Sequence, residues 1–296
     1  MAPIKLLWQS KLVLLLVLPF VAADIVLESR WWLDQVPPVA IWTLGLSVVL
    51  GLVAWQSGSA KPGAAVAGAA INASLMFATA TLPYQPWQTA LVPVMTMLVL
   101  TSLATRAGRA RKERMGIAEH RTGRAVSQVA ANLGMAAIAS NALTQDVLSS
   151  THWYPRAALV PALLLTGGVA ALAEAAADTV SSELGQLMSA RPRMLTTLRP
   201  ADPGTDGAIS LGGTLLGMLA AAVVSATAAF ALRGGWLLFA FSWIGGVFGL
   251  FFDSLLGATL ERRGWLNNDG VNFLSTVSAA VVALALLALL PAPNLP

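Results

Sequence analysis

The sequence predicts an all-α protein, a polytopic membrane helix bundle with about nine transmembrane helices. Three observations support this fold class: scarce charge, long apolar runs, and no strand-like alternation within those runs. Only 11% of the 296 residues are charged and 56% are hydrophobic, whereas a soluble domain carries roughly 25% charged residues. Long apolar runs without a two-residue period favour helices over a transmembrane barrel. We therefore expect lipid to surround most of the chain.

Nine apolar segments are each long enough, at roughly 17 to 25 residues, to cross a bilayer as a helix. The predicted spans are, in chain order, residues 11–27, 36–55, 62–82, 88–104, 125–145, 157–180, 208–232, 235–258 and 271–291. Prolines stand at several span edges, and Gly234 with Gly235 breaks the chain between the seventh and eighth spans. This punctuation fits the predicted boundaries.

The first predicted span also has features of a secretory signal peptide. Lys5 and Lys11 begin an apolar stretch that runs to Phe20, and a cleavage-like sequence follows at 21–23. We expect this segment to be retained as a helix. Its removal would leave the other eight spans oriented as before.

The lysines and arginines predict the orientation of the bundle. With the N-terminus inside, 15 of the 18 basic residues fall in inside segments, and only Arg30, Arg156 and Arg233 fall outside. Because cytoplasmic loops carry an excess of lysine and arginine, we predict an N-in, C-out protein. The basic residues lie between apolar runs rather than along one soluble face. We therefore expect no nucleic-acid partner, despite the net charge of +4.

Several chemistries are excluded by missing residues. The chain has no cysteine, which rules out disulfides, thiolate metal sites and cysteine nucleophiles. Its two histidines, His120 and His152, do not form an HExxH metal motif, and there is no P-loop, GxSxG elbow or protein-kinase signature. We expect Gly213, Gly217 and the glycines of 245–249 to serve close helix packing.

The first of three polar blocks covers residues 106–132. It contains seven basic residues against two glutamates, followed by Gln128 and Asn132 one helical turn apart on one face. A positively charged loop that contacts anionic lipid headgroups would explain the basic residues. Amides inside a span need hydrogen-bonding partners, however. We therefore take Arg121, Arg124, Gln128 and Asn132 as candidate phosphate-binding residues.

The second block covers residues 174–207. Glu174 and Asp178 are four residues apart, so they share one helix face near the inner end of the sixth span. Carboxylates at membrane depth are costly, and two on one face are explained by Mg²⁺ or an arginine between them. The structural alternative is an ion pair with Arg191 or Arg193.

The sequence Pro-Gly-Thr-Asp-Gly at 203–207 first of all predicts a turn. It also precedes the seventh span, so its backbone N–H groups and Thr205 could receive a phosphate at a helix N-terminus.

The third block covers residues 253–272. Asp253 lies between one and two turns from the inner end of the eighth span. Four polar residues bracket the start of the ninth span: Asn267, Asn268, Asp269 and Asn272. Capping explains one of these residues, but not all four together with Asp253.

The predicted topology brings the three blocks to one cytoplasmic surface beside lipid. Carboxylates for Mg²⁺ and arginines for phosphate indicate phosphoryl or nucleotidyl transfer to a membrane lipid, where catalysis is mostly positioning and charge neutralisation. A lipid-phosphate transporter or flippase would use the same groups but needs a polar path across the bilayer. Asp24 stands isolated in an otherwise apolar outer half, which favours an enzyme. A cytidylyltransferase that forms a CDP-lipid stays open from the residues alone.

Several ordered segments carry a specific resemblance. They are ADTVSSELG, RPRMLTT, PGTDGAISLGGTLLG, DSLLGATLE, NNDGVNFLST and KERMGIAEHRTGRAVSQVAANLG. Together, over about residues 61–280, they resemble the membrane family of vertebrate transmembrane protein 19 and the plant phytyl-phosphate kinase. The resemblance implies one integral membrane domain, 1–296, with variable N-terminal helices at 1–60 and a family core at 61–291. Ala177 and Ala208 stand where the family pattern has glycine, and each adds only a methyl group.

The resemblance implies a CTP-dependent, Mg²⁺-dependent kinase that converts phytyl, geranylgeranyl or a related isoprenyl monophosphate into the diphosphate. The expected catalytic residues are Asp178, Glu183 and Asp253, which with Glu174 would hold Mg²⁺. The expected phosphate-binding residues are Arg121, Arg124, Gln128, Asn132, Ser182, Arg191, Arg193, Thr205, Asp206, Asn268 and Asn272. We expect a multi-pass protein of a bacterial inner membrane, with the site on the cytoplasmic side, where CTP is found.

Overall fold

The computed structural model describes residues 7–108, 123–150, 160–188 and 191–290. Its α-helices are α1 (Leu7–Gln35), α2 (Pro37–Gln56), α3 (Pro62–Ala78), α4 (Leu91–Arg106), α6 (Val126–Ser140), α7 (Ala142–Ser150), α8 (Val160–Gly185), α9 (Leu211–Ala231), α10 (Gly235–Leu256) and α11 (Asn268–Ala288). Two short helices accompany them: the 3₁₀ turn η1 (Pro86–Gln88) and the π-helical η3 (Gly257–Glu261). A two-stranded antiparallel hairpin pairs β1 (Arg193–Met194) with β2 (Ala208–Ile209). The predicted helical membrane bundle is confirmed.

Each of the nine predicted spans coincides with a helix. Six of these helices are long and apolar enough to cross a membrane: α1, α2, α8, α9, α10 with η3, and α11. The other three, α3, α4 and α6, are apolar but only 17, 16 and 15 residues long. The count of nine spans and the N-in, C-out orientation therefore stay predictions.

Several helix boundaries differ from the prediction, and at two of them the local backbone geometry gives the reason. The fifth predicted span, 125–145, is divided at Asn141, whose extended backbone (φ −68°, ψ 142°) separates α6 from α7. The seventh span was expected to begin directly after the 203–207 turn. Instead α9 begins at Leu211 after the strand β2, and the Ser210 side chain caps it by accepting a 3.1 Å hydrogen bond from Gly213 N.

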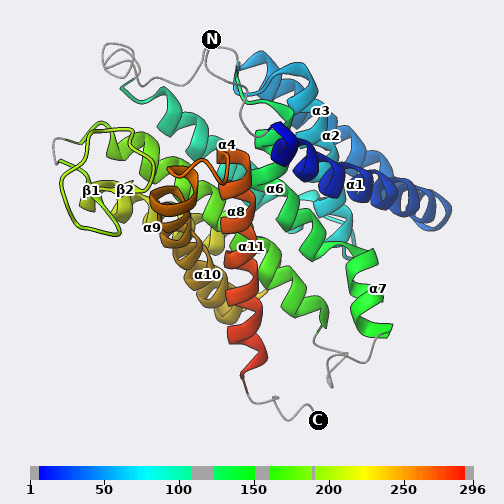
Figure 1. The fold of residues 1–296 in the computed structure, drawn as a ribbon. Coiled ribbons are helices and arrows are strands. Elements are labelled where there is room, and N and C mark those ends of the chain that lie inside the picture. The colour runs from blue at the N-terminus through cyan, green and yellow to red at the C-terminus, as the bar shows by residue number, and fades with distance from the viewer. Residues whose placement is uncertain (1–6, 109–122, 151–159, 189–190, 291–296) are drawn as a thin grey trace.

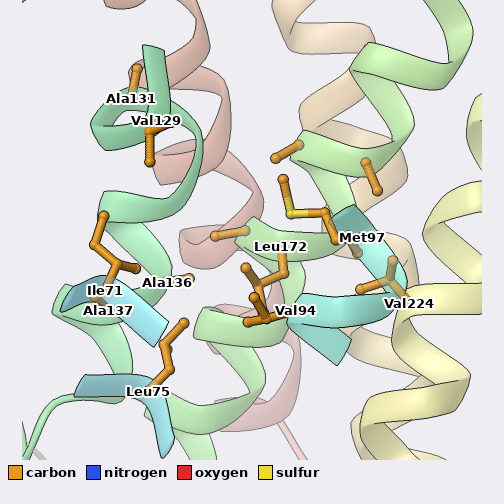
Figure 2. Close-up of a cluster of buried hydrophobic side chains, with 14 of the residues drawn as sticks. Ile71, Leu75, Val94, Met97, Val129, Ala131, Ala136, Ala137, Leu172 and Val224 are labelled. Carbon is orange, nitrogen blue, oxygen red and sulfur yellow. The ribbon is translucent and has the colours of Figure 1, made fainter. Parts of the chain in front are cut away.

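Helix α8 forms the centre of the bundle and packs against α4, α6, α9, α10 and α11. In Figure 1, α1, α2 and α3 lie on one side of this centre, and α9, α10 and the β1–β2 hairpin lie on the other. Buried aliphatic side chains join the layers: Figure 2 shows Ile71 of α3, Met97 of α4, Leu172 of α8 and Val224 of α9 in one cluster. Close van der Waals packing of this kind drives helix association in lipid.

The predicted packing role of the glycines is confirmed. A Cβ on Gly213 would lie 2.7 Å from the Ser181 carbonyl oxygen, and one on Gly217 would lie 2.8 Å from the Ala177 carbonyl oxygen. A Cβ on Gly245 would lie 2.5 Å from the Ala279 carbonyl oxygen. These contacts bring α9 against α8 and α10 against α11 at backbone distance, which only small residues allow.

Candidate functional site

A polar cavity of about 270 Å³ lies where α8 ends, α10 passes into η3 and α11 begins. The β1–β2 hairpin lies at the same end of the bundle in Figure 1. Seven predicted site residues line the cavity: Asp178, Ser182, Thr205, Asp206, Asp253, Asn268 and Asn272. Parts of the second and third polar blocks thus meet in this cavity. In the sequence, the two blocks are separated by about the length of two helices.

Two carboxylates from different helices meet in this cavity. Asp178 of α8 and Asp253 of α10 lie within hydrogen-bonding reach of each other, and Glu174 lies one turn before Asp178 within electrostatic reach of both. Carboxylates this close cannot all keep their negative charge without a proton or a cation between them. The pair is therefore a place where positive charge is required.

The same place has more hydrogen-bond acceptors than donors. Glu174 Oε1 and Asp253 Oδ2 are buried without a hydrogen-bond partner among the described residues. Ser275 is within hydrogen-bonding reach of both carboxyl groups, yet its hydroxyl also donates to the Asn272 carbonyl at 2.9 Å. One hydroxyl proton cannot serve three acceptors, so a cation fits the unpaired oxygens.

This donor set fits a magnesium ion that takes further ligands from outside the protein, rather than a structural metal held by protein side chains alone. Within the described ranges, no three acidic or histidine side chains are grouped closely enough to hold an ion by themselves. Mg²⁺ commonly uses one or two carboxylates and takes its other ligands from water and substrate phosphates. Asp178 and Asp253 can supply that share.

Glu174 can occupy this position because α10 offers a glycine opposite it. Its side chain is 1% exposed. A Cβ on Gly249 would lie 2.5 Å from Glu174 Cγ, and one on Gly246 would lie 3.1 Å from the Glu174 backbone nitrogen. The glycines that pack the helices therefore also make room for a buried carboxylate behind the cavity.

The 203–207 loop forms one wall and is seated on the first turn of η3. Gly207 has a left-handed backbone (φ +73°), and a Cβ there would collide with the Ala258 backbone. A Cβ on Gly257 would lie 2.8 Å from Gly207 N. Thr205 Oγ1 donates to the Asp202 carbonyl at 2.8 Å, as expected of a turn residue. The loop is thus held in place by backbone contact with η3.

Replacing Gly207 with alanine should move this wall. The left-handed backbone alone costs a non-glycine residue about 1–2 kcal/mol, and the collision with Ala258 adds to that cost. We expect a lower melting temperature for the purified Gly207→Ala variant. Gly264→Ala is the matched control, because Gly264 has the same left-handed backbone (φ +72°) with open space around it. Equal effects of the two substitutions would contradict the seating of the loop on η3.

The arginines are placed differently from one another. Arg124 Nη2 donates to Thr179 Oγ1 at 3.2 Å, and its guanidinium is within electrostatic reach of Asp178. Arg193 Nη1 donates to the Leu198 carbonyl of its own loop at 2.9 Å, and Arg191 is exposed. Neither Arg191 nor Arg193 lines the cavity.

The remaining predicted residues lie outside the cavity lining. Gln128 Oε1 accepts from Ala125 N at 2.7 Å, and Asn132 Nδ2 donates to the Gln128 carbonyl at 2.8 Å. Asn132 instead lines a separate apolar cavity together with Arg124. Glu183 is buried and acts electrostatically on Asp178. The predicted Arg121 lies outside the described residues.

Capping and helix anchoring account for part of the third block. Asn267 Oδ1 accepts from Gly270 N at 2.8 Å and so caps α11. Ser10 Oγ donates to Asp269 Oδ2 at 2.6 Å, and Asn267 Nδ2 donates to Ser10 Oγ at 3.0 Å, which ties the start of α1 to the start of α11. Asn268 and Asn272 are left to face the cavity.

The cavity also contains polar residues that the sequence interpretation missed: Ser181, Gln186, Ser210, Ser254 and Glu261. Glu261 ends η3 and lies within electrostatic reach of Asp206 and Asp178. Glu261 is the last residue of DSLLGATLE, one of the segments that carry the family resemblance. That membership was the sequence signal that could have identified it as a site residue. The π-helical turn, a feature frequent at functional sites, is what places it.

One expectation about the opposite part of the bundle was wrong. Asp24 was expected to be isolated, but it is 1% exposed and accepts a 2.6 Å hydrogen bond from Ser74 of α3. Helices α1 and α3 pack together. Apolar patterns do not reveal which helices are neighbours, so this pairing was hidden in the sequence.

Comparison with known proteins identifies a family and several relatives that this chain resembles. The family described as "Integral membrane protein DUF92" matches residues 45–280. An uncharacterized membrane protein, MJ0933 of Methanocaldococcus jannaschii, is 40% identical over 118 residues, which cover 40% of this chain and 49% of that protein. Another, sll0875 of Synechocystis, is 32% identical over 205 residues, covering 68% and 74%.

A plant protein is a more distant relative. Protein VTE6, chloroplastic, of Arabidopsis thaliana is 28% identical over 194 residues, covering 64% of this chain and 56% of that protein. The chain thus matches about half the length of both MJ0933 and VTE6. No solved structure matches the chain significantly.

Proposed function

Since this chain belongs to the DUF92 family of integral membrane proteins, we propose that it is a kinase-type enzyme that phosphorylates an isoprenyl monophosphate. The product is the diphosphate, and the acceptor is of the phytyl or geranylgeranyl type. The observation that carries the proposal is the contact between the carboxylates of Asp178 and Asp253 in a polar cavity of a membrane bundle. The similarity to VTE6 and the family resemblance of the motifs support the substrate class.

The reaction requires neutralisation of negative charge rather than a general base. A phosphate monoester carries about −1.5 to −2 charges at pH 7, so its oxygen is already a nucleophile. That oxygen attacks the γ-phosphorus of CTP, and the bond from this phosphorus to the β–γ bridging oxygen breaks. The products are isoprenyl diphosphate and CDP. Two anionic reactants must therefore be brought together, which is a problem of positioning and neutralisation.

Different residues of the cavity would contribute to positioning and to neutralisation. Asp178 and Asp253 would hold Mg²⁺, which neutralises charge on the nucleotide phosphates, and Glu174 and Glu183 add negative charge behind them. Arg124, beside Asp178, would neutralise the acceptor phosphate. Hydroxyl and amide groups that face the cavity can orient the phosphates: Ser182, Thr205, Asn268 and Asn272. The predicted cytoplasmic position of this end of the bundle agrees with CTP as the donor.

Two alternatives use similar groups. A cytidylyltransferase would join CMP to the lipid phosphate and release pyrophosphate instead of CDP. A lipid-phosphate transporter would move the substrate without changing it, and the buried Asp24–Ser74 contact in the opposite part of the bundle is the observation that favours it.

Product analysis separates these functions. The purified full chain is incubated in detergent with geranylgeranyl monophosphate, CTP and Mg²⁺, and the products are identified by mass spectrometry. We expect geranylgeranyl diphosphate and CDP in equal amounts, loss of both with EDTA, and recovery on adding excess Mg²⁺. CDP-geranylgeraniol with pyrophosphate would indicate the cytidylyltransferase. Unchanged substrate with every nucleoside triphosphate would overturn the proposed function.

A further inference from the structure

An apolar cavity of about 80 Å³ lies among α2, α3, α4 and α6. Most of its lining is aliphatic, with side chains such as Val94, Met97 and Leu133. The exceptions include Asn132 and Arg124. A single cationic side chain at an otherwise apolar cavity needs an anionic partner or a structural explanation.

The position of Arg124 connects this cavity with the carboxylates. Its backbone is fixed to the α2–α3 connection, because Arg124 N donates to the Ser59 carbonyl and Lys61 N donates to the Arg124 carbonyl, both at 3.1 Å. Its guanidinium reaches α8 through the 3.2 Å hydrogen bond to Thr179, the residue after Asp178. Arg124 therefore lies between an apolar space and the reacting end of the polar cavity. Within the described ranges, no lysine or arginine lines the polar cavity itself.

A second apolar cavity lies on the other side of the contact between α2 and α3. It measures about 400 Å³, lies among α1, α2 and α3, and shares Gly51 and Ala65 with the lining of the first. Val48, Leu52 and Val66 on its rim are 44% to 71% exposed. Exposed apolar side chains on a membrane helix face lipid, so this second cavity opens to the bilayer, and the close approach of Gly51 to Ala65 separates it from the first.

We propose that the first apolar cavity binds the head-proximal part of the isoprenyl chain, with its phosphate at Arg124. The proposal rests on the proposed function and adds where the lipid lies. An amphiphile with an anionic head and an apolar tail is complementary to a cation that adjoins an apolar cavity. A water-soluble phosphate would match the arginine but leave this apolar cavity without a role.

Gly68 of α3 allows the cavity to be filled without disturbing the backbone. It lines the first cavity, and a Cβ on it would meet only Val129 Cγ1, at an ordinary 3.7 Å. We expect Gly68→Leu to lower kcat/KM for geranylgeranyl monophosphate at least about tenfold, mainly through KM, as for other pockets changed by a few methylene groups. Gly68→Ala should have a smaller effect. The matched control is Gly45→Leu, because Gly45 of α2 is exposed with open space around it and lines neither apolar cavity.

Photolabelling tests the location independently of turnover. A geranylgeranyl monophosphate analogue with a diazirine in its first isoprene unit is crosslinked to the full chain, and the labelled peptides are mapped. We expect label on α3, α4 and α6, displaced by unlabelled geranylgeranyl monophosphate and lost at least about fivefold in Gly68→Leu but not in Gly45→Leu. Label on the outer faces of α9 and α10, or displacement equally well by phosphatidic acid, would overturn the proposal.

The two experiments keep the two proposals apart. Turnover with label elsewhere contradicts the lipid site alone. Specific label on α3, α4 and α6 without turnover supports the lipid site and contradicts the kinase. Neither turnover nor displaceable label overturns both.

Discussion

Asp178→Asn is expected to reduce diphosphate formation by at least about 10³-fold, the largest effect of any single substitution in this chain. Asp178 contacts Asp253 and is within electrostatic reach of Glu174, Glu183 and Arg124, so it is the common neighbour of the charged groups in the site. An amide of the same size keeps the shape but removes the charge that would hold Mg²⁺ against the nucleotide phosphates. Losses of this order follow when a group that stabilises phosphoryl-transfer charge is removed.

The same substitution should not weaken the fold. Replacing the Asp178 carboxylate with an amide would remove one of two like charges in contact, so the melting temperature of Asp178→Asn is expected to be unchanged or higher. Asp202→Asn is the matched control, because Asp202 is exposed in the neighbouring loop and outside the cavity lining. Activity in Asp178→Asn above about a tenth of the parent protein would show that the metal-site assignment is wrong.

Arg124→Gln is expected to lower kcat/KM for the isoprenyl monophosphate by on the order of 10²- to 10³-fold. The acceptor phosphate would lose the cation that lies beside Asp178, and the repulsion between acceptor and nucleotide would no longer be offset. Arginine groups that neutralise charge in phosphoryl transfer contribute effects of about 10³ or more. Arg124→Lys should recover only part of the loss, because lysine keeps the charge but not the planar, forked donor geometry.

Arg106→Gln is the control for general electrostatics. Arg106 ends α4 and is exposed, and its Nη2 donates to the Ser57 carbonyl at 2.8 Å. We expect its activity to stay within about twofold of the parent protein. A comparable loss in both arginine variants would instead indicate a diffuse effect of positive charge, such as attraction of the anionic substrate to the surface.

The sequence predicted the placement of the acidic residues correctly where one simple rule was enough. Helix periodicity put Glu174 and Asp178 on one face of the sixth predicted span, and topology put Asp253 at the same end of the bundle. Both steps need only the rise of a helix and the direction of each span. The structure then adds the contact between Asp178 and Asp253, which depends on how far α10 is rotated and how closely it approaches α8. Glycines 246 and 249 set that approach.

Other placements could not be predicted because they depend on local backbone geometry. The direction of the Arg193 side chain follows from the hairpin register, in which Arg193 pairs with Ile209. Glu261 reaches the cavity through a π-helical turn. No apolar pattern in the sequence encodes either feature. The roles of the site residues, of Mg²⁺ and of CTP stay predictions that the variants above can test.

The amino-acid sequence by itself determined that this chain is a helical membrane protein of a recognisable family, because both follow from local properties. Apolar length decides which segments form membrane helices, and ordered motifs decide the family, which the DUF92 match confirms. Only the tertiary structure decided which residues meet. The contact of Asp178 with Asp253, the position of Arg124 between two cavities, and the pairing of Asp24 with Ser74 each join helices far apart in sequence. Their neighbourhood is set by close packing of glycine and alanine surfaces, which a one-dimensional pattern does not record.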